Sequence, residues 1–190
     1  MPAEELVGHE ATDFRLPTAD SREIALSDCL SQGPAVVWFS RGLGCPVCRR
    51  HRAQFTLGYS ALRDLKAEIL EVTPTPVDRA AFYFSSYAMA FPYLCDPRRE
   101  TATAYGMEQQ PLTSWGMAKM MLSDPLGAPQ LMREAAQGPN PTPEEKAGWS
   151  AQEGFFLIDQ TRTIRVARVG SPLGIPSRAE VERMIREVSG

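Results

Sequence analysis

The chain has 190 residues, of which 43% are hydrophobic, and its net charge is −3. These values predict one domain, residues 1–190, with a sizeable core, and they exclude the global basic field of a nucleic-acid-binding protein. Residues 1–5 are acidic and do not resemble a secretory signal. No stretch approaches the ~18 consecutive apolar residues that a membrane helix needs. Four cysteines are too few for a disulfide scaffold. We therefore expect a cytoplasmic protein that binds neither nucleic acid nor a membrane.

The N-terminal part predicts a β-hairpin. Phe14 and Leu16 alternate with polar neighbours, as in a short half-buried strand, and residues 24–26 form a second short apolar run. Ser27 or Asp28 is placed to cap the helical turn that follows. This hairpin should lead into the central strand of the fold.

The next stretch organises the chain. Residues 35–39 are apolar and rich in β-branched and aromatic side chains, which predicts a strand covered on both faces. A loop with two glycines follows, and Pro46 then suits the first position of a helix. This helix should run to about residue 66, with Cys45 at its N-cap and Cys48 one turn later on the same face.

This placement of the cysteines favours redox chemistry over a buried structural pair. A helix N-terminus presents free N–H groups and a partial positive charge, which can lower a cysteine pKa from ~8.5 toward ~3.5–7.5. We predict that Cys45 is the attacking sulfur and Cys48 the resolving one. His51 is a candidate base for Cys48, although a surface or packing role is the commoner one for such a histidine. Four arginines add positive charge nearby: Arg41, Arg49, Arg50 and Arg52.

The remainder of the chain alternates strands and helices before a terminal hairpin. We expect a strand at 68–72, a helix at 77–89, a strand and turn at 91–97, a helix at 99–105, a hairpin at 154–169, and a last helix whose Ser177 and Glu180 have capping-box spacing. Residues 107–150, rich in Met, Pro and Gly, predict a helical or irregular insertion. This order predicts an α/β fold with a central mixed sheet, helices on both faces, and the site at the first strand–helix junction.

The cysteine block also carries a family resemblance. Residues 39–48, Phe-Ser-Arg-Gly-Leu-Gly-Cys-Pro-Val-Cys, resemble the F-x-R-G-x-x-C-P-x-C block of peroxiredoxin-like (alkyl hydroperoxide reductase/thiol-specific antioxidant) proteins of the thioredoxin-fold superfamily. Shorter stretches at 8–16, 91–106 and 156–159 resemble other parts of that family. The resemblance implies a thioredoxin-like fold, a hydroperoxide or disulfide substrate, a thioredoxin-type or small-thiol reductant, no cofactor or metal, and a homodimer as one mode of assembly.

The sequence departs from the family pattern around the cysteines. Typical peroxiredoxins place a proline seven residues before the peroxidatic cysteine and a Thr or Ser three before it, where this chain has Trp38 and Gly42. The family's second arginine, just before the strand at 156–159, is matched here by Gln-Glu-Gly at 152–154. Arg41 is then the candidate for stabilising charge at the reactive sulfur.

Three functions stay open at this point. The first is a thiol-dependent peroxidase, and the second is a protein disulfide oxidoreductase that uses the same CxxC on a protein partner. The missing hydroxyl favours the second, whereas the lack of a counterpart to the cis-proline of thioredoxins disfavours it. The third is a non-enzymatic, redox-derived binding module, such as a zinc site completed by Cys29 and Cys95. The spacing of those two cysteines is irregular, and both fit better as small buried hydrophobic residues.

Overall fold

The computed structural model describes residues 3–85, 88–107, 142, 152–170 and 174–189. The insertion expected at 107–150 lies, except for Met107 and Thr142, outside the described residues.

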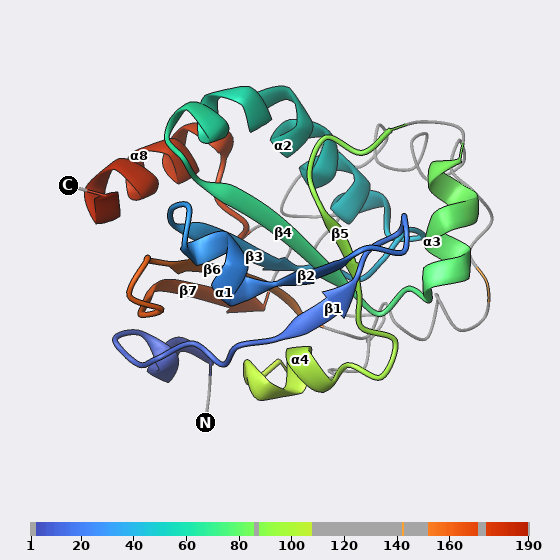
Figure 1. Ribbon diagram of the computed structural model, residues 1–190, viewed down its shortest axis with the longest axis horizontal. Helices are drawn as coiled ribbons and strands as arrows, with labels where there is room; N and C mark the ends of the chain where they lie inside the picture. The colour runs from blue at the N-terminus through green and yellow to red at the C-terminus, as the bar shows by residue number, and fades with distance from the viewer. Residues whose placement is uncertain (1–2, 86–87, 108–141, 143–151, 171–173, 190) are drawn as a thin grey trace, which may run out of the picture.

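A five-stranded sheet in the order β5-β4-β3-β6-β7 forms the centre of the molecule (Figure 1). Its strands are β3 (Ala35–Phe39), β4 (Glu68–Thr73), β5 (Tyr93–Cys95), β6 (Glu153–Ile158) and β7 (Ile164–Gly170). β3, β4 and β5 run parallel, whereas β6 pairs antiparallel with both β3 and β7. The predicted mixed sheet is therefore confirmed, and β3 is its middle strand.

The predicted N-terminal hairpin is also present. It consists of β1 (Arg15–Pro17) and β2 (Glu23–Ala25), which pair antiparallel after the 3-10 turn η1 (Ala3–Leu6), and α1 (Leu26–Leu30) follows directly. An isolated bridge between Thr18 and Leu94 attaches the hairpin to β5. Leu16 and Ile24 of the hairpin also pack against the core on the face of the sheet that α1 covers.

The expected cap of α1 by Ser27 or Asp28 is wrong. Ala25 is the N-cap and makes no side-chain bond. Instead the Ser27 N–H donates to Asp13 Oδ1 at 3.1 Å, so a carboxylate from before the hairpin satisfies an otherwise free N–H of the first turn. A side chain distant in sequence has replaced the local cap.

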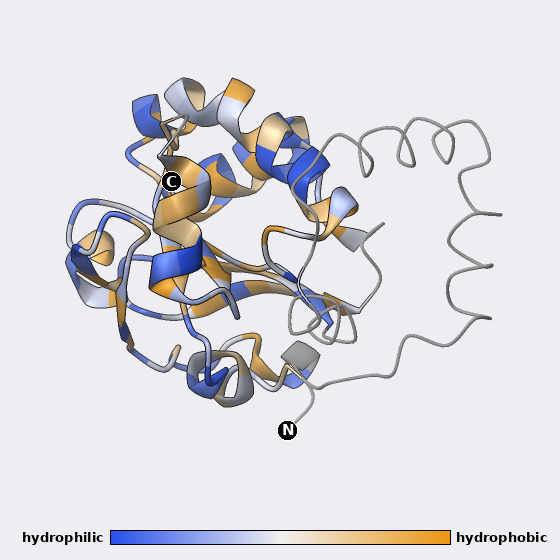
Figure 2. Ribbon diagram, turned by 90° about the vertical axis from the view of Figure 1, so that its right-hand side faces the viewer, coloured by the Kyte–Doolittle hydropathy of each residue, from blue (hydrophilic) through white to orange (hydrophobic). Residues whose placement is uncertain are grey.

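Helices cover both faces of the sheet (Figure 1). α2 (Pro46–Asp64) and α8 (Arg178–Ser189) lie side by side on one face, α1 and α4 (Glu100–Ala104) lie on the other, and α3 (Val77–Phe84) packs near β5. In Figure 2 these helices carry both hydrophobic and hydrophilic residues, as expected where one side of a helix meets the core. Among the described helices, none combines the length and the apolar character needed to cross a membrane.

Two other helix ends were predicted from the sequence. The helix predicted at 77–89 is too long, because α3 ends at Phe84 with Ser85 as its C-cap. The Ser85 hydroxyl donates to the carbonyl of Phe82 at 2.7 Å and satisfies an acceptor left free at the helix end. At the start of α8, the N–H of Ser177 donates to Glu180 Oε2 at 2.9 Å and the N–H of Glu180 donates to Ser177 Oγ at 3.4 Å, which confirms the predicted capping box.

β3 is buried on both of its faces. Val37 and Phe39 pack toward α1 and α4, whereas Val36 and Trp38 pack toward α2 and α8, and no residue of the strand is more than 3% exposed. This double burial explains why the strand is a continuous apolar run in the sequence. It also fixes the loop after Phe39, which carries the cysteines, at the carboxyl end of the central strand.

Candidate active site

The two cysteines of the CPxC motif lie at the N-terminus of α2. Cys45 is the N-cap with extended backbone angles (φ −81°, ψ 113°), and Pro46 opens the helix, as the sequence predicts. The backbone N–H of Cys48 donates to Cys45 Sγ at 3.3 Å. Both are free thiols, with Cys45 2% and Cys48 0% exposed. One sulfur therefore faces a free amide of the first helical turn.

Arg41 lies next to both cysteines. Its backbone N–H donates to Cys48 Sγ at 3.4 Å, and its side chain is 8% exposed. Burial raises the pKa of Cys45, but hydrogen bonding from Cys48 and the positive charge of Arg41 outweigh burial, so the pKa of Cys45 is lowered from the ordinary thiol value of 9.0. Arg41 thus occupies the position that its candidate role requires.

Cys48 has the opposite tendency. Burial raises its pKa well above 9.0, and hydrogen bonding to Cys45 and the negative charge of Glu153 act in the same direction. The surroundings therefore make Cys45 the more acidic of the two thiols. This asymmetry matches the predicted division into an attacking and a resolving sulfur.

Glu153, the first residue of β6, is a buried carboxylate that sequence reasoning did not identify as part of the site. It is 1% exposed. Its Oε1 accepts hydrogen bonds from Trp38 Nε1 at 3.2 Å and lies 3.0 Å from His51 Nδ1, while its Oε2 lies 3.8 Å from Arg41 Nη2. The available signal was an acidic residue at the start of an otherwise apolar strand.

Two departures from the family pattern are therefore in contact. Trp38 stands where peroxiredoxins have proline, Glu153 belongs to the Gln-Glu-Gly stretch matched to their second arginine, and the indole of Trp38 donates to the carboxylate of Glu153. His51 completes the group, with its ring 6.0 Å from the Trp38 ring between centroids in an edge-on arrangement. His51, the candidate base for Cys48, has Glu153 and not Cys48 as its hydrogen-bond partner.

Arg52, expected to add positive charge near the cysteines, is paired with a buried carboxylate. Its guanidinium bonds both oxygens of Glu71 on β4, at 2.8 and 2.6 Å, and lies 5.1 Å from the centre of the Tyr93 ring. The hydroxyl of Ser40 donates to Glu71 Oε1 at 2.7 Å and accepts from the Gly42 N–H at 3.3 Å. This buried pair therefore anchors the loop that carries Arg41.

Gly42 shows why no hydroxyl residue stands there. Its φ is +91°, in the region that favours glycine, and a Cβ on it would lie 2.8 Å from Thr75 Oγ1. The Thr75 hydroxyl is itself held by Tyr93, with 2.9 Å between the two oxygens. A serine or threonine at position 42 would require both the backbone and Thr75 to move.

The other two cysteines are placed apart from the motif. Cys29 packs against the core beneath the hairpin, whereas Cys95 packs with Ala80 of α3. Burial raises the pKa of Cys29 to about 11 and that of Cys95 to about 12. Within the described ranges, no cluster of three or more potential metal ligands occurs. The structure does not bring these cysteines to Cys45 and Cys48.

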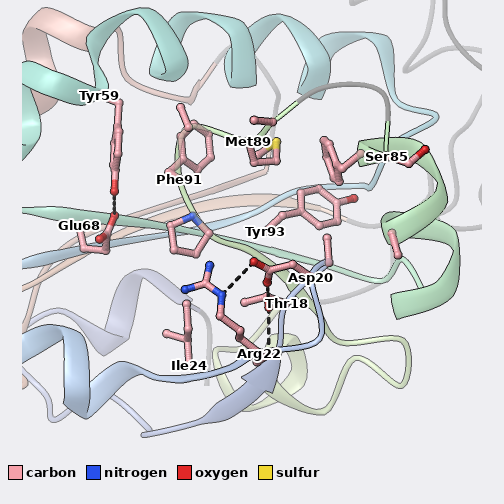
Figure 3. Close-up of a pocket in the computed structure, with 16 residues that line it drawn as sticks. Thr18, Asp20, Arg22, Ile24, Tyr59, Glu68, Ser85, Met89, Phe91 and Tyr93 are labelled. Carbon is pink, nitrogen blue, oxygen red and sulfur yellow. Dashed lines mark hydrogen bonds and ion pairs between the residues drawn. The ribbon is translucent and has the colours of Figure 1, made fainter.

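A separate hollow of about 720 Å³ opens between the hairpin, α2, α3 and β5. Figure 3 shows Phe91 and Tyr93 along it, with the ion pair of Asp20 and Arg22 on the hairpin side and Tyr59 on the α2 side. Neither cysteine of the motif lines this hollow. The hollow is therefore separate from the cysteine pair at the N-terminus of α2.

Comparison with known proteins establishes the family. The family model described as the AhpC/TSA family matches residues 7–167. The chain belongs to the AhpC/TSA family. Two curated relatives from Mycobacterium tuberculosis strains CDC 1551 and H37Rv, both named as candidate peroxiredoxins, are 26% identical to this AhpC/TSA chain over 99 residues. The match covers 52% of this chain and 62% of each relative's length.

Solved structures confirm the fold of this AhpC/TSA chain. The peroxidoxin BcpB from Mycobacterium tuberculosis superposes with a TM-score of 0.66 at 18% identity and covers 96% of this chain and 97% of its own. A reduced 2-Cys peroxiredoxin from Plasmodium vivax gives 0.66 at 14% identity, covering 97% and 96%. A thiol:disulfide interchange protein DsbE candidate from Chlorobium tepidum gives 0.63 at 16% identity, covering 97% and 98%. The predicted thioredoxin-like fold is thus shown.

Proposed function

We propose that this AhpC/TSA protein is a thiol-dependent peroxidase that reduces hydroperoxides through Cys45, with Cys48 as the resolving cysteine. One observation carries the proposal: Cys45 Sγ accepts the Cys48 N–H at the start of α2, beside the Arg41 cation, while Cys48 remains protonated. The nucleophile in such chemistry is a thiolate, and this arrangement favours the thiolate form at Cys45 and the thiol form at Cys48. Such a pair can carry both halves of a redox cycle.

The cycle has three balanced steps. The Cys45 thiolate attacks the terminal oxygen of a hydroperoxide, the O–O bond breaks, and a sulfenic acid and an alkoxide form, the alkoxide taking a proton to leave as an alcohol. The Cys48 sulfur then attacks the Cys45 sulfur and expels the hydroxyl, which leaves as water with the Cys48 proton, so that a disulfide forms. A thioredoxin-type protein or a small thiol returns two electrons and two protons by exchange.

Peroxide consumption by the purified protein with dithiothreitol or thioredoxin tests this proposal. We expect turnover by the wild type and none by Cys45→Ser, because that variant has no nucleophile. Without added reductant, Cys48→Ser should consume about one equivalent of peroxide and leave a sulfenic acid on Cys45, detectable by mass after reaction with dimedone. Cys29→Ser is the matched control and should turn over normally. Equal turnover by Cys45→Ser and the wild type would refute the assignment.

A protein disulfide oxidoreductase is the second candidate. The observation that favours it is the buried carboxylate of Glu153 beside Arg41, in the stretch matched to the second arginine of peroxiredoxins and in a site whose residue 42 has no hydroxyl. Insulin reduction separates the two candidates, since activity there without peroxidase activity would favour the exchange reaction. Both candidates need reduced cysteines between turnovers, which fits a cytoplasmic setting.

A further inference from the structure

The turn that ends at Cys45 has a bare position at Gly42. The N–H of Cys45 donates to the carbonyl of Gly42 at 3.4 Å, so residues 42–45 form one tight turn. A Cβ on Gly42 would lie 2.8 Å from Thr75 Oγ1. Apart from the chain neighbours of Gly42, that oxygen is the one atom of the described residues within 4 Å of the Cβ position. A hydroxyl from another loop therefore faces the unfilled side of the turn.

Thr75 presents this hydroxyl from a rigid segment. Pro74 and Pro76 flank it, and a proline fixes its own φ and restricts the residue before it to extended conformations. The N–H of Thr75 donates to Thr73 Oγ1 at 3.1 Å, and Thr75 is 2% exposed. Because the segment is already fixed, little conformational entropy is lost when its hydroxyl binds a ligand.

The Thr75 hydroxyl has hydrogen-bonding capacity left. Its hydrogen-bond partner among the described residues is the Tyr93 hydroxyl, with 2.9 Å between the two oxygens. A hydroxyl has one donor and two acceptor sites, so at least one lone pair of Thr75 Oγ1 stays open whichever oxygen donates. Ser40, which belongs to the cysteine loop itself, is by contrast bonded to both Glu71 and the N–H of Gly42. Of these two hydroxyls, Thr75 is the one that can accept a further hydrogen bond.

We infer that Thr75 binds the hydroperoxide and orients it toward Cys45. The inference rests on the proposed peroxidase function. The terminal O–H of the hydroperoxide donates to Thr75 Oγ1, which holds the terminal oxygen beside the turn at Gly42, next to the Arg41 cation that favours the Cys45 thiolate. A fixed acceptor limits the orientations of the O–O bond, and attack by sulfur depends on that orientation. The hydroxyl neither gains nor loses a proton, so the balance of the cycle is unchanged.

Formation of the sulfenic acid in a Cys48→Ser background tests the inference, because it isolates the first step of the cycle. The sulfenic acid on Cys45 is trapped with dimedone and quantified by mass at a series of hydrogen peroxide concentrations. We expect Thr75→Val to lower the second-order rate constant about 10-fold or more, because a hydrogen bond to the substrate is lost. Thr75→Ser keeps the hydroxyl and should keep most of the rate. Thr101→Val, at a buried threonine of α4, is the matched control and should react like the parent.

A second reagent separates substrate binding from a change in the cysteine itself. Methyl methanethiosulfonate reacts with the same thiolate but has no O–H or N–H to donate, so Thr75→Val should be labelled on Cys45 at the parent rate. Equal slowing toward peroxide and toward this reagent would mean that Thr75 acts on the structure or acidity of Cys45, and the inference would then be wrong.

Removing both hydroxyls controls for misfolding. In Thr75→Val the Tyr93 hydroxyl loses a buried partner, whereas the double variant with Tyr93→Phe removes both polar groups and should recover stability in urea unfolding. We expect the double variant to stay as slow toward peroxide as Thr75→Val, since no hydroxyl has returned. Tyr93→Phe alone retains Thr75 Oγ1 and should lose less. A double variant that regains the parent rate would show that Thr75 matters for packing only.

The outcomes also separate this inference from the proposed function. If the wild type turns over no peroxide and the parent forms no sulfenic acid, both fail. If both reactions proceed and Thr75→Val reacts with peroxide as fast as the parent, the peroxidase proposal stands and the assignment of Thr75 is wrong.

Discussion

At the scale of single residues, the guanidinium of Arg41 interacts with both Cys45 and Glu153. Arg41 faces the Cys45 sulfur, and its Nη2 also lies 3.8 Å from Glu153 Oε2. In a buried site such charges are screened weakly, so the arginine stabilises the thiolate against the opposing effect of the carboxylate. The reactivity of Cys45 therefore depends on the balance between these two side chains.

Replacing Arg41 should raise the pKa of Cys45. In Arg41→Gln the Cys45 pKa should rise, because the cation that favours the thiolate is lost, and alkylation by iodoacetamide near neutral pH should fall about 10-fold or more. A pH series of alkylation rates in a Cys48→Ser background measures the effect. Arg22→Gln, on the exposed hairpin, is the control and should follow the parent curve. An unchanged curve for Arg41→Gln would remove this residue from the site.

At the scale of elements, β3, the loop after it and α2 are connected by buried polar contacts to β4. The Arg52–Glu71 pair joins α2 to β4, and Ser40 connects the pair to the N–H of Gly42. All the oxygens and nitrogens involved lie in the interior, where hydrogen bonds are stronger and unpaired groups are costly. The loop that carries Arg41 is therefore fixed before any substrate arrives.

Breaking this buried pair should be more costly than breaking one on the surface. Arg52→Met should lower the free energy of unfolding by about 3–5 kcal/mol, because Glu71 is left as an uncompensated buried charge. Replacing both partners, Arg52→Met with Glu71→Leu, should recover much of the loss. Urea unfolding of the reduced protein gives these values.

The surface pair of Arg63 and Glu68 provides the comparison, since the Arg63 side chain is 45% exposed. Arg63→Ala should cost about 1 kcal/mol or less. A loss of similar size for Arg52→Met and Arg63→Ala would show that the Arg52–Glu71 pair does not anchor the loop.

Local patterns could predict the elements and the local part of the site. The apolar run of β3, the proline after Cys45 and the capping box of α8 are signals within a few residues of one another, and each was confirmed. The cap of α1 was wrong because Asp13, which lies before the hairpin, supplies it. Hydrophobic periodicity in the sequence does not indicate a side-chain contact across the hairpin.

Glu153 was also missed because its contacts come from residues distant in the sequence. It is 115 residues from Trp38 in the sequence, and the two side chains meet because β6 pairs antiparallel with β3, with Phe39 opposite Gly154. Periodicity predicts that both strands exist but does not fix their register. Arg52 was misjudged similarly, since its partner Glu71 comes from a neighbouring strand.

At the scale of the whole molecule, loss of the proton from Cys45 is coupled to folding. The pKa of Cys45 is lower in the folded protein than the ordinary thiol value of 9.0. Between those two pKa values the unfolded chain binds the proton that the folded chain has released, so stability rises with pH there. This contribution is fully present above the ordinary value and is lost as the pH falls through the folded value.

Comparison of the reduced wild type with Cys45→Ser isolates this contribution. The stability advantage of the wild type over the variant should increase between about pH 6 and about pH 8.5, by at most about 1.4 kcal/mol per pH unit. Urea unfolding under reducing conditions at both pH values measures it. Cys29→Ser should show no such rise below 9.0, since burial raises the pKa of Cys29 to about 11. A constant difference between wild type and Cys45→Ser would contradict the lowered pKa.

The backbone at Gly42 constrains how this sequence can be related to other members of its family. Because φ is +91° and Thr75 occupies the space that a side chain would need, introducing the hydroxyl residue of typical peroxiredoxins also requires a change at Thr75. The two positions are epistatic, and so are Trp38 and Glu153 through their shared hydrogen bond. We therefore expect a substitution toward the common pattern at position 42 or 38 to be tolerated only when its partner, Thr75 or Glu153, is changed with it.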